Sequence, residues 1–141
     1  CATLIIRRSS DDEIVYVFQH YFLPQKKIDQ LDEHNTQEAP YKIWAERGLV
    51  TICEGTRVDY SAVTAWYCQM RDELKIDAFK IGYDRALAGY WVDEMKANGF
   101  EMCAVAQGPF TWSQPMRELG AALADKKVNY NKNPVLLWCL R

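Results

Sequence analysis

The sequence is poor in residues that bind metals through imidazole or sulfur. Its two histidines, His20 and His34, lie far apart, and its five cysteines are scattered without forming a Cys–x–x–Cys pair. Because the neighbours of the cysteines are apolar, we expect buried thiols in a reducing compartment, and neither disulfides nor a zinc site. We expect His20 to lie on a strand and His34 in a loop.

Three further absences narrow the function. The formal net charge is only −2, so any contact with nucleic acid must come from a local basic patch. No run of about 18 apolar residues occurs, which predicts no membrane span, and the N-terminus lacks the pattern of a signal peptide. Neither GxxxxGK[ST] nor GxGxxG is present, which argues against nucleotide binding by those two routes.

What is present suits a folded domain with a core, since 49% of the 141 residues are hydrophobic. The chain begins with Cys1 in a strand-like run and ends at Arg141, directly after the apolar stretch VLLWCL. Both ends would leave apolar segments unprotected. We therefore expect residues 1–141 to be a single, partial domain from a longer protein, incomplete at both ends.

The first half of the chain predicts a β-hairpin followed by a short helix and a strand. Residues 2–8 and 14–23 are rich in β-branched and aromatic residues and flank the polar turn SSDDE. Residues 25–40 are polar and predict an exposed excursion. The stretch 41–48 predicts a short helix that ends at Gly48, and 49–53 predicts a strand.

The second half alternates helices and strands. A helix capped by Asp59 or Ser61 is followed by a strand at 79–84, which we expect to be the most buried one. A single helix then runs to Gly99, a strand spans 100–106, and a third helix begins with the Ser–x–Pro sequence at Ser113. Antiparallel pairing followed by helix-separated strands predicts an α/β fold with a mixed sheet flanked by helices.

Asp84 is the leading candidate for a functional residue, because functional groups of open α/β sheets gather at the carboxyl ends of strands. It could be a metal ligand, a general base or simply the N-cap of the following helix. A nuclease site would need two or three carboxylates to hold divalent ions. Asp11, Asp12 and Glu13 are better explained as a solvated turn, and Glu54 as a turn residue.

A second candidate feature is the loop that contains Lys126, Lys127 and Lys132. These lysines alternate with asparagines and one tyrosine, a combination that suits contact with a phosphate backbone. Composition alone slightly favours an ordinary solvated loop.

Four stretches in order resemble the nuclease domain of the large terminase subunit of tailed bacteriophages. They are WAERGLVTICEGTRVDYSAV, IGYDRALAGYWVDEM, QGPFTWSQPMRELGAAL and NPVLLWCLR. Each motif is weak alone, but the four together, with compatible spacing, are specific. The resemblance implies a ribonuclease H-like fold and an enzyme that cuts concatemeric phage DNA with two ions, Mg²⁺ or Mn²⁺.

By the Tyr-Asp motif, Asp84 is expected to be one of the catalytic, metal-binding carboxylates. In the family, a second catalytic carboxylate lies on a strand upstream of the opening hairpin, and a third lies beyond the Asn-Pro–Trp tail. Because neither region is present, this chain alone should be inactive. It should also lack the central strand of its sheet. The resemblance also implies double-stranded DNA, the terminase small subunit, the portal protein and further copies of the chain as partners, in the cytoplasm of an infected bacterium. A resolvase- or integrase-type nuclease and a non-catalytic α/β interaction module are the alternatives.

Overall fold

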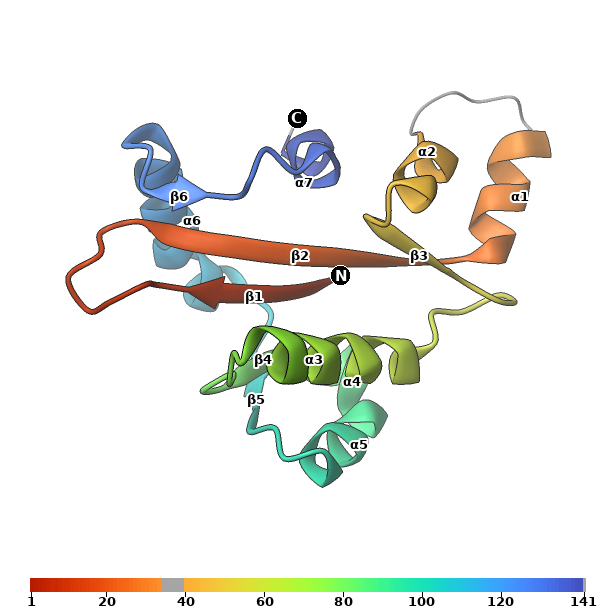
Figure 1. Ribbon diagram of the computed structural model, residues 1–141, viewed down its shortest axis with the longest axis horizontal. Coiled ribbons are helices and arrows are strands. Elements are labelled where there is room, and N and C mark those ends of the chain that lie inside the picture. Colours follow the sequence, from red (N-terminus) through yellow and green to blue (C-terminus); the bar gives the residue numbers. More distant parts are fainter. Residues whose placement is uncertain (34–39, 141) are drawn as a thin grey trace.

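The computed structural model describes residues 1–33 and 40–140, so the prediction for His34 lies outside the described residues. Strands and helices alternate along most of the chain (Figure 1). The strands are β1 (Ala2–Ile6), β2 (Val15–Pro24), β3 (Val50–Cys53), β4 (Ile81–Asp84), β5 (Met102–Val105) and β6 (Val128–Asn129). The helices are α1 (Gln25–Glu33), α2 (Tyr41–Glu46), α3 (Tyr60–Leu74), α4 (Arg85–Ala88), the 3₁₀ turn η1 (Gly89–Trp91), α5 (Val92–Ala97), α6 (Pro109–Ala124) and α7 (Pro134–Cys139).

The strands form two separate sheets. In the larger one β2 is central: it pairs antiparallel with β1, from Ala2 opposite His20 onward, and parallel with both β3 and β6. In the smaller one β4 pairs parallel with β5, with Asp84 opposite Val105. The sequence predicted the α/β class and the mixed pairing, but it predicted one sheet where the described residues form two.

The division leaves two strand edges facing a shared cleft. Among the described residues β1 pairs only with β2, and β4 only with β5. A cleft of about 650 Å³ is lined by residues of β1, by residues 76–82 and by Trp112. On its wall the Tyr67 hydroxyl donates to the Thr3 carbonyl (3.2 Å) and accepts from the Thr3 amide (3.4 Å). One phenol from α3 thus satisfies a backbone pair that a neighbouring strand would otherwise take.

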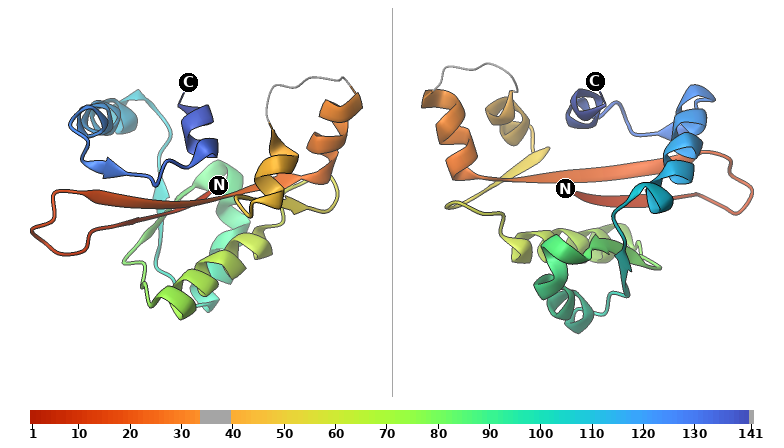
Figure 2. Two further views of the ribbon diagram at one scale, coloured as in Figure 1. Left: turned by 45° about the horizontal axis from the view of Figure 1, so that its top comes forward. Right: turned by 180° about the vertical axis from the view of Figure 1, so that it is seen from behind.

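Helices cover both faces of the larger sheet, and the side chains of its strands alternate accordingly. Phe22 of β2 joins the main core, which also contains residues from β1, α3, β4 and α5. Met95 of α5 is fully buried in it. Its neighbours Tyr21 and Leu23 face the other way, toward a smaller cluster around Trp44 of α2. Figure 2 shows α3 on one side of the β1–β2 pair and α2 and α7 on the other.

Three predictions about helices are wrong. The excursion predicted for 25–40 contains α1, since Ile28 is buried and the Lys26 amide donates to the Gly55 carbonyl (3.1 Å). The helix predicted to run to Gly99 is broken at Ala88, because the backbone of this residue (φ −126°, ψ 14°) is not helical. The third helix begins at Pro109, not at Ser113, because proline suits the first helical position.

The prediction that the strand at 79–84 is the most buried one is also wrong. This strand is β4, and only its Ile81 is buried. Phe79, just before it, is exposed, because one edge of β4 has no strand neighbour within the described part of the chain. The predicted helix ends at Gly48 and Gly99 are confirmed: both adopt the left-handed backbone (φ +69° and +86°) that glycine tolerates best.

Candidate active site

Asp84 lies at the carboxyl end of β4, where the chain turns into α4. Its Oδ1 accepts a hydrogen bond from the Ala86 amide at 2.9 Å, so Asp84 is the N-cap that the sequence allowed. The structure gives Oδ2 no hydrogen-bond partner among the residues that it describes. The cap therefore occupies one oxygen, and the other remains for a ligand. The two interpretations of Asp84 are compatible.

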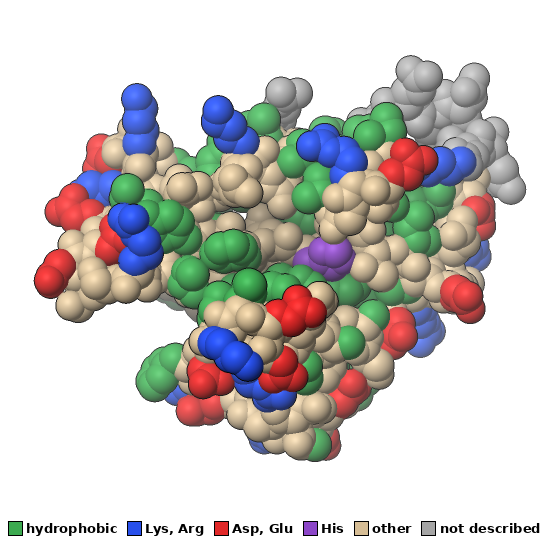
Figure 3. Space-filling view, viewed as in Figure 1, with side chains coloured by type: hydrophobic (Ala, Val, Ile, Leu, Met, Phe, Trp, Pro, Cys, Tyr) green, Lys and Arg blue, Asp and Glu red, His purple; other side chains and the backbone are tan. Residues whose placement is uncertain are grey.

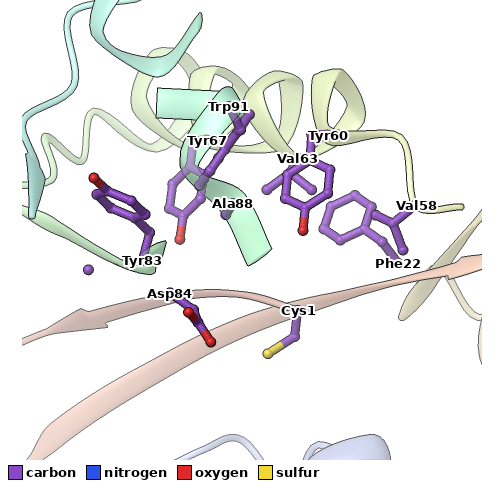
Figure 4. Close-up of a pocket in the computed structure, with 11 residues that line it drawn as sticks. Cys1, Phe22, Val58, Tyr60, Val63, Tyr67, Tyr83, Asp84, Ala88 and Trp91 are labelled. Carbon is purple, nitrogen blue, oxygen red and sulfur yellow. The ribbon is translucent and has the colours of Figure 1, made fainter. Parts of the chain in front are cut away.

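Asp84 faces a pocket of about 360 Å³ whose walls are mainly aromatic (Figure 4). Its rings come from β2, α3, β4 and η1, and they belong to Phe22, Tyr60, Tyr67, Tyr83 and Trp91. Among the lining residues, Asp84 has the only charged side chain. A single carboxylate with one oxygen outside the cap bond can accept a cation or a hydrogen-bond donor from this pocket.

The wall opposite Asp84 is built at the start of α3. Asp59 caps this helix, since its Oδ1 accepts from the Ser61 amide at 2.9 Å, as the sequence predicted. This cap fixes Tyr60 as the first helical residue. The Tyr60 ring lies 5.2 Å from that of Tyr90 and 5.8 Å from that of Trp91, measured between centroids. Tyr60 is thereby held between α3 and η1.

A buried hydrogen bond ties these two elements together. The Trp91 indole Nε1 donates to Thr64 Oγ1 at 2.8 Å, and both side chains are almost fully buried. Gly82 of β4 allows close packing on the opposite side, because a Cβ there would lie 3.1 Å from a Val105 methyl group. These contacts explain the aromatic and glycine positions around Asp84 in structural terms.

Two tyrosines of the pocket, Tyr60 and Tyr67, stay protonated. Burial raises the pKa of Tyr60, and Tyr90 and the Asp84 charge raise it further. Burial likewise raises the pKa of Tyr67, partly offset by its hydrogen bond from the Thr3 backbone. Both phenols are therefore neutral hydrogen-bond donors across the physiological pH range.

The residues present fit only part of a metal site. Within 1–33 and 40–140 no three His, Cys, Asp or Glu side chains lie close enough together to hold a metal ion. Hard divalent ions take about six oxygen ligands, several of them carboxylates, and the pocket offers one. Asp84 therefore suits one ligand of such a site, and any further ligands lie elsewhere.

The other acidic candidates lie outside this pocket. Asp12 accepts a hydrogen bond from Arg8 Nε at 2.7 Å, and this bond lowers the pKa of the carboxyl group. Asp11 and Glu13 are exposed in the same turn, and Glu54 is exposed after β3. The turn interpretation agrees with the structure for Asp11, Glu13 and Glu54, whereas the Asp12 side chain is only 8% exposed and is held in the turn by Arg8 and by the Ile14 amide.

The three lysines of the predicted basic loop are not equivalent. Lys126 and Lys132 are exposed, and both have left-handed backbones (φ +59° and +50°) on either side of β6. Lys127 Nζ instead lies 3.2 Å from Glu13 Oε2 in the hairpin turn. Figure 3 shows basic and acidic side chains mixed at this end of the molecule.

The predicted thiols and imidazole can also be placed. All five cysteines are free, as expected, but only Cys53 is buried; Cys1, Cys103 and Cys139 are exposed. The prediction of buried thiols is therefore wrong for these three, because apolar neighbours do not guarantee cover on a two-stranded sheet or a short terminal helix. His20 lies on β2 as predicted, and its Nε2 is 2.7 Å from Thr51 Oγ1.

Two residues near Asp84 were not singled out from the sequence: Tyr60 and Tyr90. The available signal for Tyr60 was its position directly after the Asp59 cap. No sequence pattern pointed to Tyr90, because its approach to Tyr60 depends on the break between α4 and α5.

A mixed α/β fold with a strand-ending carboxylate beside a pocket is compatible with a nuclease domain. The whole chain, residues 1–141, matches the family model described as "Terminase large subunit, endonuclease domain". The chain belongs to this family.

No helix in the described part of the chain is long and apolar enough to cross a membrane.

Individual relatives agree with this assignment. The chain is 27% identical over 138 residues to the "Terminase, large subunit" of Enterobacteria phage HK97, covering 96% of this chain and 27% of that protein. It is 28% identical over 119 residues to "Protein YmfN" of Escherichia coli (strain K12), covering 80% of this chain and 24% of that protein. It thus spans about a quarter of the length of these relatives.

The fold comparison gives the same result. The crystal structure of the HK97 bacteriophage large terminase superposes with a TM-score of 0.77 and 26% identity, over 95% of this chain and 28% of that one. This likeness agrees with the ribonuclease H-like fold expected from the sequence.

Proposed function

We propose that this chain is part of the endonuclease domain of a phage terminase large subunit, and that the complete domain cuts concatemeric double-stranded DNA with Mg²⁺ or Mn²⁺. The observation that carries the proposal is the geometry of Asp84. Its carboxylate ends a strand, faces a pocket and keeps one oxygen without a protein partner among the described residues. Membership of the terminase endonuclease family supports the reaction class.

Asp84 would hold one divalent ion through the oxygen that the cap leaves available. Divalent ions supply, when bound, the positive charge that phosphodiester hydrolysis requires. The remaining carboxylates would come from outside residues 1–141, in keeping with the quarter of the relatives' length that the chain spans. By itself the chain is expected to be inactive.

The cleft between β1 and β4 is where a central strand would complete the sheet. Both bordering strands have an edge without a strand partner in the described part of the molecule, and the cleft runs beside them. A strand placed there would end near Asp84 and could carry a second carboxylate. In this proposal Tyr67 gives up its bonds to Thr3 when that strand pairs with β1.

Contacts to the DNA backbone would come from the loop with Lys126, Lys127 and Lys132. Lys126 and Lys132 are the stronger contributors, because Lys127 is already close to Glu13. Replacing either by Gln should weaken DNA binding for all sequences and reduce the salt dependence by about one unit of slope. Lys96→Gln, at an exposed lysine of α5, is the matched control and should bind DNA as wild type does. Unchanged binding by both loop variants would remove the loop from the interface.

The partners and location follow from the family alone. We propose that the complete protein acts in the cytoplasm of the infected host, with the terminase small subunit, with the portal protein and with further copies of itself. Co-purification of the complete subunit with its portal protein would test this part.

The decisive experiment replaces Asp84 in the complete subunit. Asn is as good an N-cap as Asp but carries no charge, so Asp84→Asn should melt normally while losing Mn²⁺ binding and at least 100-fold in DNA cleavage. Asp84→Ala should lose cleavage as well, with only a small loss of stability. Asp59→Asn, at the corresponding cap of α3, is the matched control and should cleave normally.

The same experiment separates the nuclease from an interaction module. The cap bond to Ala86 is the observation that favours a purely structural Asp84. Near-normal cleavage and metal binding by Asp84→Asn would support that role and reject the proposed function.

A further inference from the structure

Tyr60 lies on the pocket wall with its hydroxyl group directed into the pocket that Asp84 faces (Figure 4). Its ring is half-buried and fixed by Tyr90 and Trp91, while Tyr90 itself is 73% exposed. The Tyr60 hydroxyl also donates a hydrogen bond to that of Tyr90, and it is close enough to Asp84 to be influenced by its charge. A hydrogen-bonding phenol pair thus extends from the pocket to the surface.

We propose that, when DNA binds, the Tyr60 hydroxyl turns its proton from Tyr90 to a non-bridging phosphate oxygen of the DNA strand at Asp84, and that Tyr90 then donates to the Tyr60 oxygen. This inference rests on the proposed function, because it takes DNA as the occupant of the pocket. Tyr60 is then a substrate-contacting residue of the same site, and Tyr90 is a positioning residue.

The chemistry of the pocket favours a neutral donor. A phosphate oxygen near Asp84 meets a like charge, and a lysine in the wall would pair with the carboxylate and compete with a cation for it. A phenol donates to an anion without forming an ion pair with Asp84. An ordinary phenol has a pKa of about 10, so it is a neutral donor over the pH range of DNA cleavage.

The other phenols of the wall are less suited to this role. The Tyr67 hydroxyl both donates to and accepts from the Thr3 backbone, which makes its role structural. Tyr83 precedes Asp84 on β4, and Figure 4 shows its hydroxyl directed away from the carboxylate, as expected for consecutive strand residues. Tyr60 is the phenol that enters the pocket from the opposite wall.

The test compares Tyr60→Phe with wild type in the complete terminase large subunit. Two readouts are measured: the Kd for double-stranded DNA in EDTA, without divalent ions, and the single-turnover cleavage rate in Mn²⁺ at saturating DNA. We expect a 3- to 10-fold weaker Kd and a cleavage rate lower by about 10-fold or more, in line with the loss of one donor to an anionic oxygen. Mn²⁺ affinity should not change, since Asp84 is intact.

Two further variants make the result specific. Tyr21→Phe is the matched control, because that half-buried tyrosine lies on the other face of β2 and donates to Gln19. It should behave as wild type. If Tyr90 acts through Tyr60, Tyr90→Phe should weaken DNA binding and slow cleavage by smaller factors than Tyr60→Phe. The double variant Tyr60→Phe/Tyr90→Phe should bind and cleave no worse than Tyr60→Phe alone. Should Tyr60→Phe not fold, Tyr90→Phe carries the test.

Parallel measurements on Asp84→Asn distinguish the two proposals. Loss of cleavage by Asp84→Asn with wild-type values of both readouts in Tyr60→Phe would overturn the Tyr60 inference and leave the nuclease assignment standing. Normal cleavage by Asp84→Asn would overturn the nuclease assignment itself.

Discussion

The hydrogen bond between Trp91 and Thr64 should be worth about 2 kcal/mol to the folded state, and Thr64→Val measures it. Valine has nearly the shape of threonine, so packing is preserved while the acceptor of the indole N–H is removed. The bond is 2.8 Å long, and Thr64 and Trp91 are only 4% and 6% exposed, so no water replaces the lost oxygen. A buried donor without a partner costs about 1–3 kcal/mol. The hydroxyl's bond to the Tyr60 carbonyl (3.3 Å) is lost as well.

Urea and thermal denaturation followed by circular dichroism would measure this cost. The midpoint of thermal unfolding should fall by about 5–10 °C for Thr64→Val, and by less for Thr64→Ser, which keeps the acceptor. Thr56→Val, at an exposed threonine, should stay within about 0.5 kcal/mol of wild type.

A double-mutant cycle with Trp91→Phe isolates the bond from the rest of the effect. Because Phe has no N–H to leave unsatisfied, Thr64→Val should cost less in the Trp91→Phe background, by about 1 kcal/mol. Equal costs in both backgrounds, or a neutral Thr64→Val in wild type, would refute the claim that this bond holds η1 against α3.

Three further predictions concern stability. Met95→Ala should lower the free energy of unfolding by about 2–5 kcal/mol, because Met95 is fully buried in the main core. Lys96→Ala, at an exposed site of α5, should lower it little. Urea denaturation measures both changes. Asn133→Ala should cost about 1 kcal/mol in the same assay and Asn133→Asp much less, since its Oδ1 caps α7 by accepting from two amides. Burial lowers the pKa of His20 below its usual 6.5, so the native state keeps it neutral; its contribution to stability is complete above pH 6.5 and declines as pH falls toward the native pKa. Unfolding free energies measured across pH 5–8 should lose this slope in His20→Gln.

The local elements were largely predictable because short-range rules decide them. The hairpin followed from two β-branched, aromatic runs around a polar turn, and the structure pairs Ala2–Ile6 with β2. Helix termini were equally readable, from the Asp59 cap to the glycines at 48 and 99. The family motif at the C-terminal tail also has a local cause: Asn133 caps α7, Pro134 occupies its first position and Val135 is buried.

Features that depend on distant partners were not predictable. Burial of β4 was overestimated because an apolar sequence does not reveal whether a neighbouring strand is present. The same reasoning failed for Cys103 and Cys139, whose apolar neighbours suggested cover that the described residues do not provide. For the site, Asp84 could be found from strand order, whereas Tyr60 and Tyr90 required the break at Ala88 that brings η1 against α3.

The cap role of Asp84 and its proposed ligand role, which compete at the level of sequence, are compatible in the structure. The bond from Ala86 to Oδ1 limits the rotation of the side chain, so Oδ2 is held in one direction before any ion arrives. Preorganisation of this kind lowers the entropy cost of binding and is strongest when the supporting elements are rigid. Here the support is the buried set of Trp91, Thr64 and Met95 behind the pocket. The rigid half of the site is therefore already built, and the side toward β1 is the one on which further ligands would have to enter.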